Sequence, residues 1–230
     1  PVDACLGDLM KLETSTADYL QQSVPGFDME APHYWANSVL ADGVTAADLT
    51  VSEPALIGWL HTLEAISQLC MASARYRAAA NYARRVLKAE GYPTRAAGTV
   101  LLALARLEDQ DGFFALAHQL EEQMGADALE NSPWYLLART ILLFKTNKMR
   151  PATRALREFA NRCAFFLLNP MYQTPYLPCR PEPRDPWDLS HQAVWEADGI
   201  ISDTPDFAPW ANACEDVSQL AQEFARRYGF

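Results

Sequence analysis

The sequence contains little glycine and no long run of apolar residues. Only 10 of its 230 residues are glycine, whereas alanine and leucine are abundant, and this composition favours helices over strands. No apolar stretch approaches the roughly 18 residues that a membrane-spanning helix needs, and no signal peptide opens the chain. We therefore expect an all-α protein that is located in the cytoplasm and is not inserted in a membrane.

Cysteines are also scarce, and they are scattered along the chain. The 5 cysteines are odd in number and lie far apart, so they do not suggest a disulfide framework. Cys70, Cys163 and Cys214 fall on apolar helix faces, where a buried free thiol is the expected state. Free thiols are typical of a reducing compartment, which agrees with a cytoplasmic location.

Sequence motifs of known chemistry are missing. The chain has neither the Walker nor the dinucleotide-binding glycine pattern, and no Cys-x-x-Cys or His-Glu-x-x-His pair. The 4 histidines lie far apart, although His61 and Glu64 share a helix face at three-residue spacing. This is the spacing of a metal or acid–base pair, and equally that of an ordinary exposed helical pair. The sequence therefore predicts no catalytic residue, no metal site and no cofactor.

Positive charge is sparse near both ends of the chain. The formal net charge is -10: residues 1–60 contain nine acids and one base, and residues 182–223 contain ten acids and one base. Residues 139–162 instead contain seven bases and one acid. We interpret this pattern as solvated faces together with acidic segments docked on the basic one, with a phosphate-binding patch as the alternative. The acidic total disfavours nucleic acid as a partner.

What the sequence does contain is an internal repeat of helix-sized segments. Small and apolar positions recur 34 residues apart, and after a three-residue insertion the first half of the pattern returns once more. The first copy has Leu63, Ile66, Ser67, Cys70, Tyr76, Ala79, Ala83 and Val86; the second has Ala97, Val100, Leu101, Leu104, Gln110, Phe113, Ala117 and Leu120; the third has Trp134, Leu137, Ala138 and Ile141. A period near 34 is typical of helix-turn-helix units, which stack because one hairpin cannot bury its apolar face alone.

Apolar spacing and stop signals together predict the individual helices. Two helices, over 3–23 and 32–41, precede the repeat, and two more, over 189–197 and 209–228, follow it. The repeat is predicted as three hairpins, made by 52–73 with 77–90, 94–107 with 112–124, and 132–145 with a partner that opens at Pro151. Ser52 and Ser132, each followed closely by a proline, are expected to cap helix starts.

Six prolines between Asn169 and Pro186 interrupt the helical pattern. Since proline removes amide donors and restricts the preceding residue, we expect an extended segment here. Tyr172, Tyr176 and Leu177 are suited to burial, which favours a strap along the hairpins; a proline-rich ligand for another domain is the alternative. The predicted divisions are an N-terminal helical segment, three hairpins, and the strap with C-terminal capping helices, over residues 1–51, 52–168 and 169–230.

The repeat resembles the tetratricopeptide family, best where the pattern of Ala79, Ala83 and Val86 returns in the second copy. In the third copy, Arg150 stands where that family usually has a small residue. The resemblance implies an α-α solenoid of helical hairpins that acts as a non-catalytic scaffold or adaptor, because that broad family has no shared catalytic residues.

A second, narrower resemblance covers residues 169–197. The runs Asn169-Pro170 and Pro175-Tyr176-Leu177, followed by Glu196-Ala197, are similar to a segment of proteins related to suppressor of tumorigenicity 7. In those proteins a helix likewise leads into a proline-containing strap and then into a further helix. Pro178 departs from the pattern, since it replaces the second leucine.

The predicted binding surface is the concave side formed by the first helix of each hairpin, where we expect a protein or peptide partner. The residues expected to line it or to lie beside it are His61, Glu64, Gln68, Arg95, Gly98, Leu102, Arg106, Ser132, Tyr135 and Arg139. The arginines suit an acidic segment or a terminal carboxylate, and solvated arginines are the alternative.

Two further interpretations stay open at this point. In the first, the strap fills the groove, and the chain either binds partners elsewhere or self-associates as a homodimer through the apolar stripe of its last helix. In the second, the protein is a helical enzyme or an accessory subunit of one.

Overall fold

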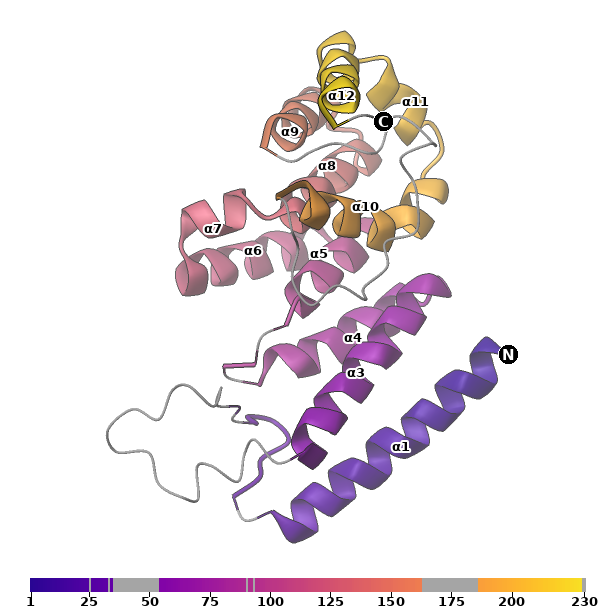
Figure 1. Cartoon of the computed structure of the whole chain (residues 1–230), viewed down its shortest axis with the longest axis vertical. Coiled ribbons are helices and arrows are strands. Elements are labelled where there is room, and N and C mark those ends of the chain that lie inside the picture. Colours follow the sequence, from indigo (N-terminus) through magenta and orange to yellow (C-terminus); the bar gives the residue numbers. More distant parts are fainter. Residues whose placement is uncertain are drawn as a thin grey trace. The chain divides into compact units, whose positions relative to one another are not determined.

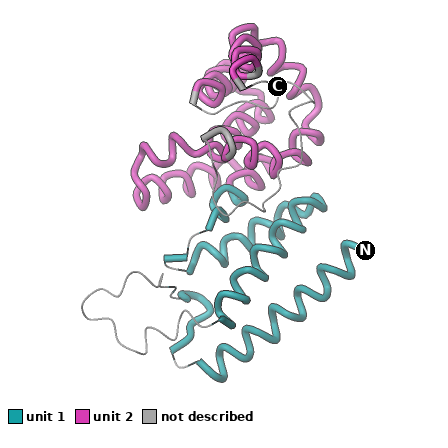
Figure 2. The backbone as a smooth tube through the Cα atoms, viewed as in Figure 1, with its two compact units in different colours: residues 1–100 teal, residues 101–230 magenta. Residues whose placement is uncertain are grey.

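The computed structural model of this protein describes residues 1–24, 26–32, 34, 54–89, 91–92, 94–162 and 186–228. Within these ranges the chain forms helices and no strands (Figure 1), so the predicted all-α class is confirmed there. The chain divides into two compact units, residues 1–100 and 101–230 (Figure 2). Both predicted division points, 51/52 and 168/169, lie outside the described residues. So do the cap at Ser52, most of the helix predicted over 32–41, and the strap up to residue 185, with the runs Asn169-Pro170 and Pro175-Tyr176-Leu177 of the second resemblance.

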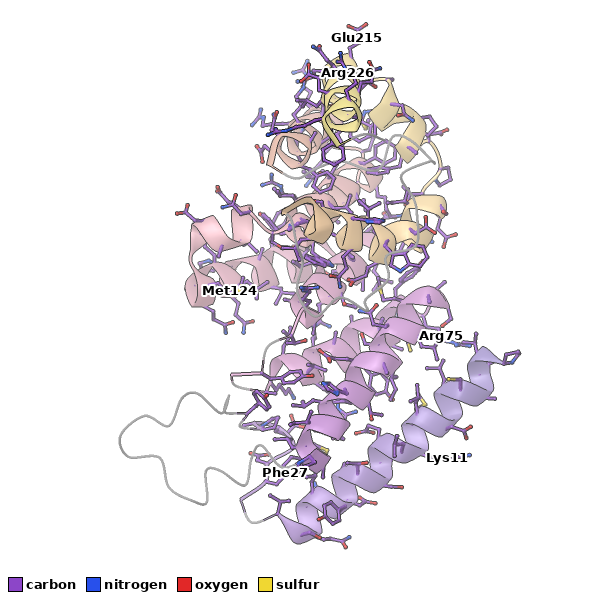
Figure 3. The ribbon with its side chains drawn as sticks, in the orientation of Figure 1. Lys11, Phe27, Arg75, Met124, Glu215 and Arg226 are labelled. Carbon is purple, nitrogen blue, oxygen red and sulfur yellow. The ribbon has the colours of Figure 1, made fainter. Side chains whose placement is uncertain are left out.

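The first unit is built on three long helices. α1 (Val2–Ser23) lies antiparallel to α3 (Pro54–Ala72), and α3 packs on α4 (Tyr76–Leu87) (Figure 1). Side chains of α1 such as Lys11 point away from α3, whereas Leu6, Ala17 and Leu20 are buried (Figure 3). The helix therefore buries one apolar stripe, as an amphipathic helix does.

The second unit begins within α5 and contains the remaining helices. Its hairpin core is α8 packed on α9, with α10 against α8 and α12 against both α9 and α11. The helices from α5 onward are α5 (Ala96–Arg106), α6 (Gln110–Met124), α7 (Ala126–Glu130), α8 (Pro133–Lys145), α9 (Met149–Arg162), α10 (Pro186–Ser202), α11 (Phe207–Asn212) and α12 (Glu215–Tyr228).

The same turn joins α3 to α4, α5 to α6, and α8 to α9. In each turn three residues separate the helices, and the middle one has a positive φ: Ala74 at 59°, Glu108 at 59° and Asn147 at 57°. The amide that follows donates to the carbonyl five residues earlier: Arg75 to Cys70 at 2.8 Å, Asp109 to Leu104 at 3.1 Å and Lys148 to Leu143 at 2.9 Å. This is the Schellman arrangement, here built without glycine.

These turns fix the register of the repeat. The residues five, nine and twelve positions after each positive-φ residue are all buried: Ala79, Ala83 and Val86; Phe113, Ala117 and Leu120; Ala152, Leu156 and Phe159. The third copy has two extra residues between Ile141 and its turn, so Ala152, and not Arg150, takes the position of Ala79. α9 accordingly opens at Met149 rather than at the predicted Pro151.

Most predicted core positions and the predicted helix cap at Ser132 are confirmed. Every first-copy and third-copy position named above is buried, and in the second copy only Ala97 and Gln110 are half-buried. The Ser132 hydroxyl accepts from the amide of Tyr135 at 3.4 Å and precedes Pro133 at the first helical position. This is the cap that the sequence predicts.

The prediction of one continuous helix over 209–228 is wrong. α11 ends at Asn212 and α12 starts at Glu215. The Ser218 hydroxyl donates to the Asn212 carbonyl at 2.9 Å, which satisfies an acceptor that a continuous helix would bond through its backbone. Glu215 and Asp216 stand in the first turn of α12, where acidic side chains stabilise a helix start.

Candidate partner-binding surfaces

Two predicted surface residues of the first unit, Glu64 and Gln68, form hydrogen bonds with other polar residues of that unit. Glu64 accepts from the hydroxyls of Tyr92 at 2.9 Å and Thr94 at 2.5 Å, and Gln68 donates to Thr99 at 3.1 Å. Burial, and secondarily the Glu64 carboxylate, raise the pKa of Tyr92 well above its ordinary value. The phenol therefore stays protonated and acts as a donor.

His61, Gln68 and Arg95 are the exposed members of this group. The His61 ring lies 6.2 Å from the ring of Tyr92, whereas Gly98 is buried and so adds no accessible surface. The prediction that His61, Glu64 and Arg95 bind a partner remains a prediction. In the structure, the Glu64 carboxylate already accepts hydrogen bonds from two hydroxyls of the chain itself, those of Tyr92 and Thr94.

The predicted residues of the second unit are engaged in contacts of their own. Tyr135 is buried, stacks on Phe113 at a centroid distance of 6.0 Å, and lies under the Arg139 guanidinium at 5.2 Å. Arg139 pairs with Glu158 on α9, and Arg106 lies 3.8 Å from Asp203. Leu102 is also buried. An acidic ligand at Arg106 or Arg139 would therefore compete with a carboxylate of the chain itself.

A different surface, which the sequence analysis did not single out, lies between α1 and α3. A groove of about 370 Å³ opens there, within the roughly 300–1,000 Å³ of typical ligand sites. The residues that line it are Leu12, Ser15, Thr16 and Tyr19 of α1 and Ala55, Gly58 and Thr62 of α3. Leu12 is 52% exposed and Tyr19 is 48% exposed, so large apolar side chains flank an open concavity.

The serine and threonine hydroxyls in this groove bond to their own helices. Thr16 donates to the Leu12 carbonyl at 2.8 Å, Ser15 to the Lys11 carbonyl at 2.9 Å, and Thr62 to the Gly58 carbonyl at 2.7 Å. Their donors are used, so the groove makes little demand for a polar ligand. At Gly58 a Cβ would meet nothing within 4 Å, which shows that the floor of the groove has room.

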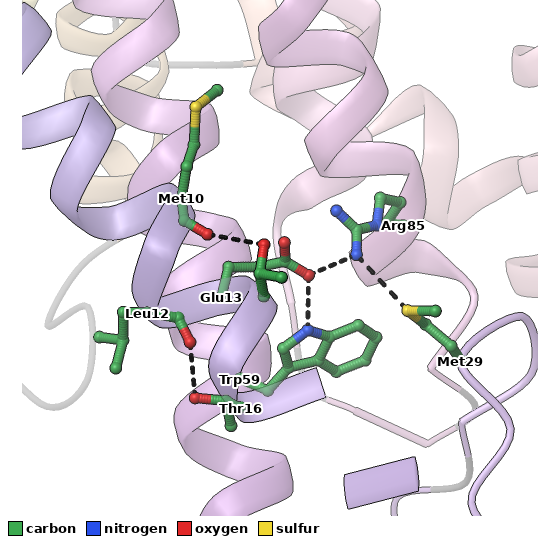
Figure 4. A network of polar contacts seen from close by, with 8 residues as sticks. Met10, Leu12, Glu13, Thr16, Met29, Trp59 and Arg85 are labelled. Carbon is green, nitrogen blue, oxygen red and sulfur yellow. Dashed lines mark hydrogen bonds and ion pairs between the residues drawn. The ribbon is translucent and has the colours of Figure 1, made fainter. Parts of the chain in front are cut away.

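A buried ionic network holds α1 in place beside the groove (Figure 4). The Glu13 carboxylate accepts from the indole N–H of Trp59 on α3 at 2.8 Å and from Arg85 on α4 at 2.5 Å. The Arg85 guanidinium also lies over the Trp59 ring at 5.6 Å, and the rings of Phe27 and Trp59 form a T-shaped pair with centroids 5.6 Å apart. One side chain of α1 is thus bonded to both helices of the first hairpin.

The sequence carried a weak signal for the groove. Leu12 and Tyr19 are spaced seven residues apart and fall outside the stripe of Leu6, Ala17 and Leu20. Two apolar stripes on one helix indicate two contact faces. Leu12 and Tyr19 on the second face are about half-exposed.

The described cysteines are free thiols. Cys70 is buried as predicted, and burial raises its pKa, so the thiol stays protonated. Cys214 is half-buried with a pKa raised by burial and then by Asp216, whereas Cys5 is exposed. Cys163 lies outside the described residues. A raised pKa disfavours the nucleophilic thiolate at Cys70 and Cys214.

Neither a metal site nor a membrane-spanning helix is found in the described ranges. There, no group of three or more His, Cys, Asp or Glu side chains is placed to hold a metal ion. The helices described are also too short or too polar to cross a bilayer. Comparison with protein-family models, curated proteins and solved structures gave no match.

Proposed function

We propose that this protein is a non-catalytic interaction module of tetratricopeptide-like hairpins, and that a segment of a partner protein binds in the groove between α1 and α3. The recurring turn and the recurring buried positions support the repeat assignment. The observation that carries the binding site is an open groove flanked by half-exposed Leu12 and Tyr19.

The groove favours an apolar ligand segment. Burying the exposed halves of Leu12 and Tyr19 would contribute about 1 kcal/mol each. The serine and threonine hydroxyls of the groove bond to carbonyls of their own helices, so an apolar ligand would leave none of these three without an acceptor. Helices commonly bind such grooves with apolar side chains spaced three and four residues apart.

The negative charge around the groove favours apolar partner segments that also carry positive charge. The exposed side chains of α1 include Asp8 and Asp18, and residues 1–60 contain nine acids against Lys11. Complementary charge speeds association and fixes register. The occupant that fits is therefore an amphipathic helix of a partner protein with an apolar face and basic flanks. Self-association through this groove would bring acidic faces together and is disfavoured.

A plug at Gly58 tests this proposal. A Cβ added at Gly58 would meet nothing within 4 Å, so we expect a Gly58→Leu side chain to fill part of the groove. Gly7→Leu is the matched control, because Gly7 also lies in a helix with open space at its Cβ but does not line the groove. The probe is a fluorescent helical peptide with leucines on one face and lysines on the flanks, followed by anisotropy.

We expect Gly58→Leu to weaken binding of this peptide at least about tenfold, which corresponds to a loss of about 1.4 kcal/mol of binding free energy. Gly7→Leu should leave the affinity unchanged. A peptide with glutamates in place of the lysines should bind more weakly. Equal binding to both variants and wild type would overturn the groove as the site. Light scattering that shows a dimer lost on Gly58→Leu would point to a second copy as the occupant instead.

A further inference from the structure

A row of arginines marks the exposed face of α9. Arg150, Arg154 and Arg157 follow one another at spacings of four and three residues, which places them on one side of the helix. All three are exposed. The other side of α9 carries Ala152, Ala155, Leu156 and Phe159, all buried. The arginines are therefore directed away from the core of the second unit.

Other bases of the segment 139–162 already have partners. Lys145 lies 3.0 Å from Glu108, Arg139 pairs with Glu158, and Lys148 donates to Gln110. Arg150 and Arg154, by contrast, make no ion pair with any side chain that the structure describes. Two adjacent guanidinium groups without a counter-ion, one helical turn apart, are a strong local concentration of positive charge.

The C-terminal end of the row shows how it binds a carboxylate. The Nε of Arg157 donates to Asp216 at 2.5 Å, and both side chains are about half-exposed. Asp216 lies in the first turn of α12, the helix that packs on α9. An acidic helix start of the chain itself thus occupies one end of the row, and the remaining two arginines continue the same face.

We propose that Arg150 and Arg154 bind an acidic segment of a partner protein, whose carboxylates extend the row that Asp216 begins. The guanidinium fork binds carboxylates in a bidentate manner. From Arg150 to Arg157 the row spans about 10 Å of helix, which matches two or three carboxylates at helical spacing. Nucleic-acid binding commonly involves about 6–10 phosphate contacts, and the chain's net charge of -10 opposes a long polyanion.

A charge-matched pair of variants tests this surface. Arg150→Gln with Arg154→Gln removes two positive charges and keeps the side-chain stems. Arg77→Gln with Arg84→Gln is the control, because these α4 residues are also exposed and the net charge changes equally. Asn81 separates them, so they do not form an adjacent pair. The probe is a short fluorescent helical peptide with glutamates at helical spacing, measured at low and physiological salt.

We expect Arg150→Gln with Arg154→Gln to weaken peptide binding about fivefold or more. The control pair should change the affinity less than about twofold, which is roughly the effect of lowering the net charge alone. Added salt should weaken peptide binding to wild type. Far-UV circular dichroism confirms that both variants fold. Equal losses in both variants, or α9-dependent binding of a single-stranded oligonucleotide or of phosphatidylserine vesicles in place of the peptide, would overturn the proposal. Gly58→Leu should leave this binding unchanged, so failure here is distinct from failure of the α1–α3 groove.

Discussion

Glu13→Gln is expected to loosen α1 from the first hairpin. The Glu13 side chain is 10% exposed and accepts from both Trp59 and Arg85. Glutamine keeps the shape and can still accept from the Trp59 indole, but the charge opposite Arg85 is lost. Hydrogen bonds to charged groups contribute about 1.5–3 kcal/mol, and removing one partner of a fully buried pair costs about 3–5 kcal/mol. Because the Arg85 side chain is 31% exposed and can reach water, we expect a loss of about 2 kcal/mol.

Hydrogen exchange measured by mass spectrometry is the assay, because it reports the opening of α1 separately from unfolding elsewhere. The control is Asp8→Asn, the same carboxylate-to-amide change on the same helix. Asp8 pairs with Lys11 where both side chains are about four-fifths exposed, so we expect a change below about 0.5 kcal/mol. Exchange of α1 amides should accelerate in Glu13→Gln and not in Asp8→Asn. Equal exchange in the two variants would refute the role assigned to the network.

Three further substitutions test the turns, the Glu64 hydrogen bonds and the groove. Ala74→Gly should stabilise the protein by about 0.5–1 kcal/mol, because alanine has a φ of 59° there. The control Ala65→Gly, within α3, should destabilise it by about 1 kcal/mol. Urea unfolding measures both changes, and a destabilised Ala74→Gly variant would contradict the turn geometry. The pKa of Tyr92 is raised well above its ordinary value of 10.0, so its contribution to stability is present below about pH 10 and is lost as the pH rises further. The difference in unfolding free energy between wild type and Tyr92→Phe should therefore shrink as the pH rises above about 10, and parallel pH profiles would count against this. Gly58→Ala should raise the free energy of unfolding by up to about 1 kcal/mol, since its Cβ meets nothing; a lower value would mean that the groove floor is closed.

Much of the helical framework followed from the sequence, because apolar periodicity and caps act locally. Ser132 before Pro133 marked the start of α8, and the 34-residue period placed the buried residues of the first two hairpins. The register of the third hairpin did not follow. Two extra residues before Asn147 lengthen α8 without breaking its helical pattern, and they shift the register of α9 only. The repeat spacing alone could therefore not reveal them.

The candidate sites depended on contacts between elements, and these are harder to predict. Arg106 and Arg139 looked available for a partner, yet Asp203, just after α10, contacts Arg106, and Glu158 on the neighbouring helix α9 pairs with Arg139. The groove exists only where α1 packs on α3, because α1 contributes Leu12 to its lining and α3 contributes Gly58. The acidic segments were expected to dock on basic ones, and Asp216 on Arg157 confirms this for one pair.

The most direct test of the central proposal is where a bound peptide touches the protein. Methyl groups of Leu12 and Ala55 line opposite helices of the groove, and isotope labelling allows nuclear Overhauser contacts from the leucines of the amphipathic probe to be detected at each. The account predicts contacts to both methyl groups in wild type and their loss in Gly58→Leu. Contacts only to residues away from α1 and α3, or none when the peptide is saturating, would contradict it.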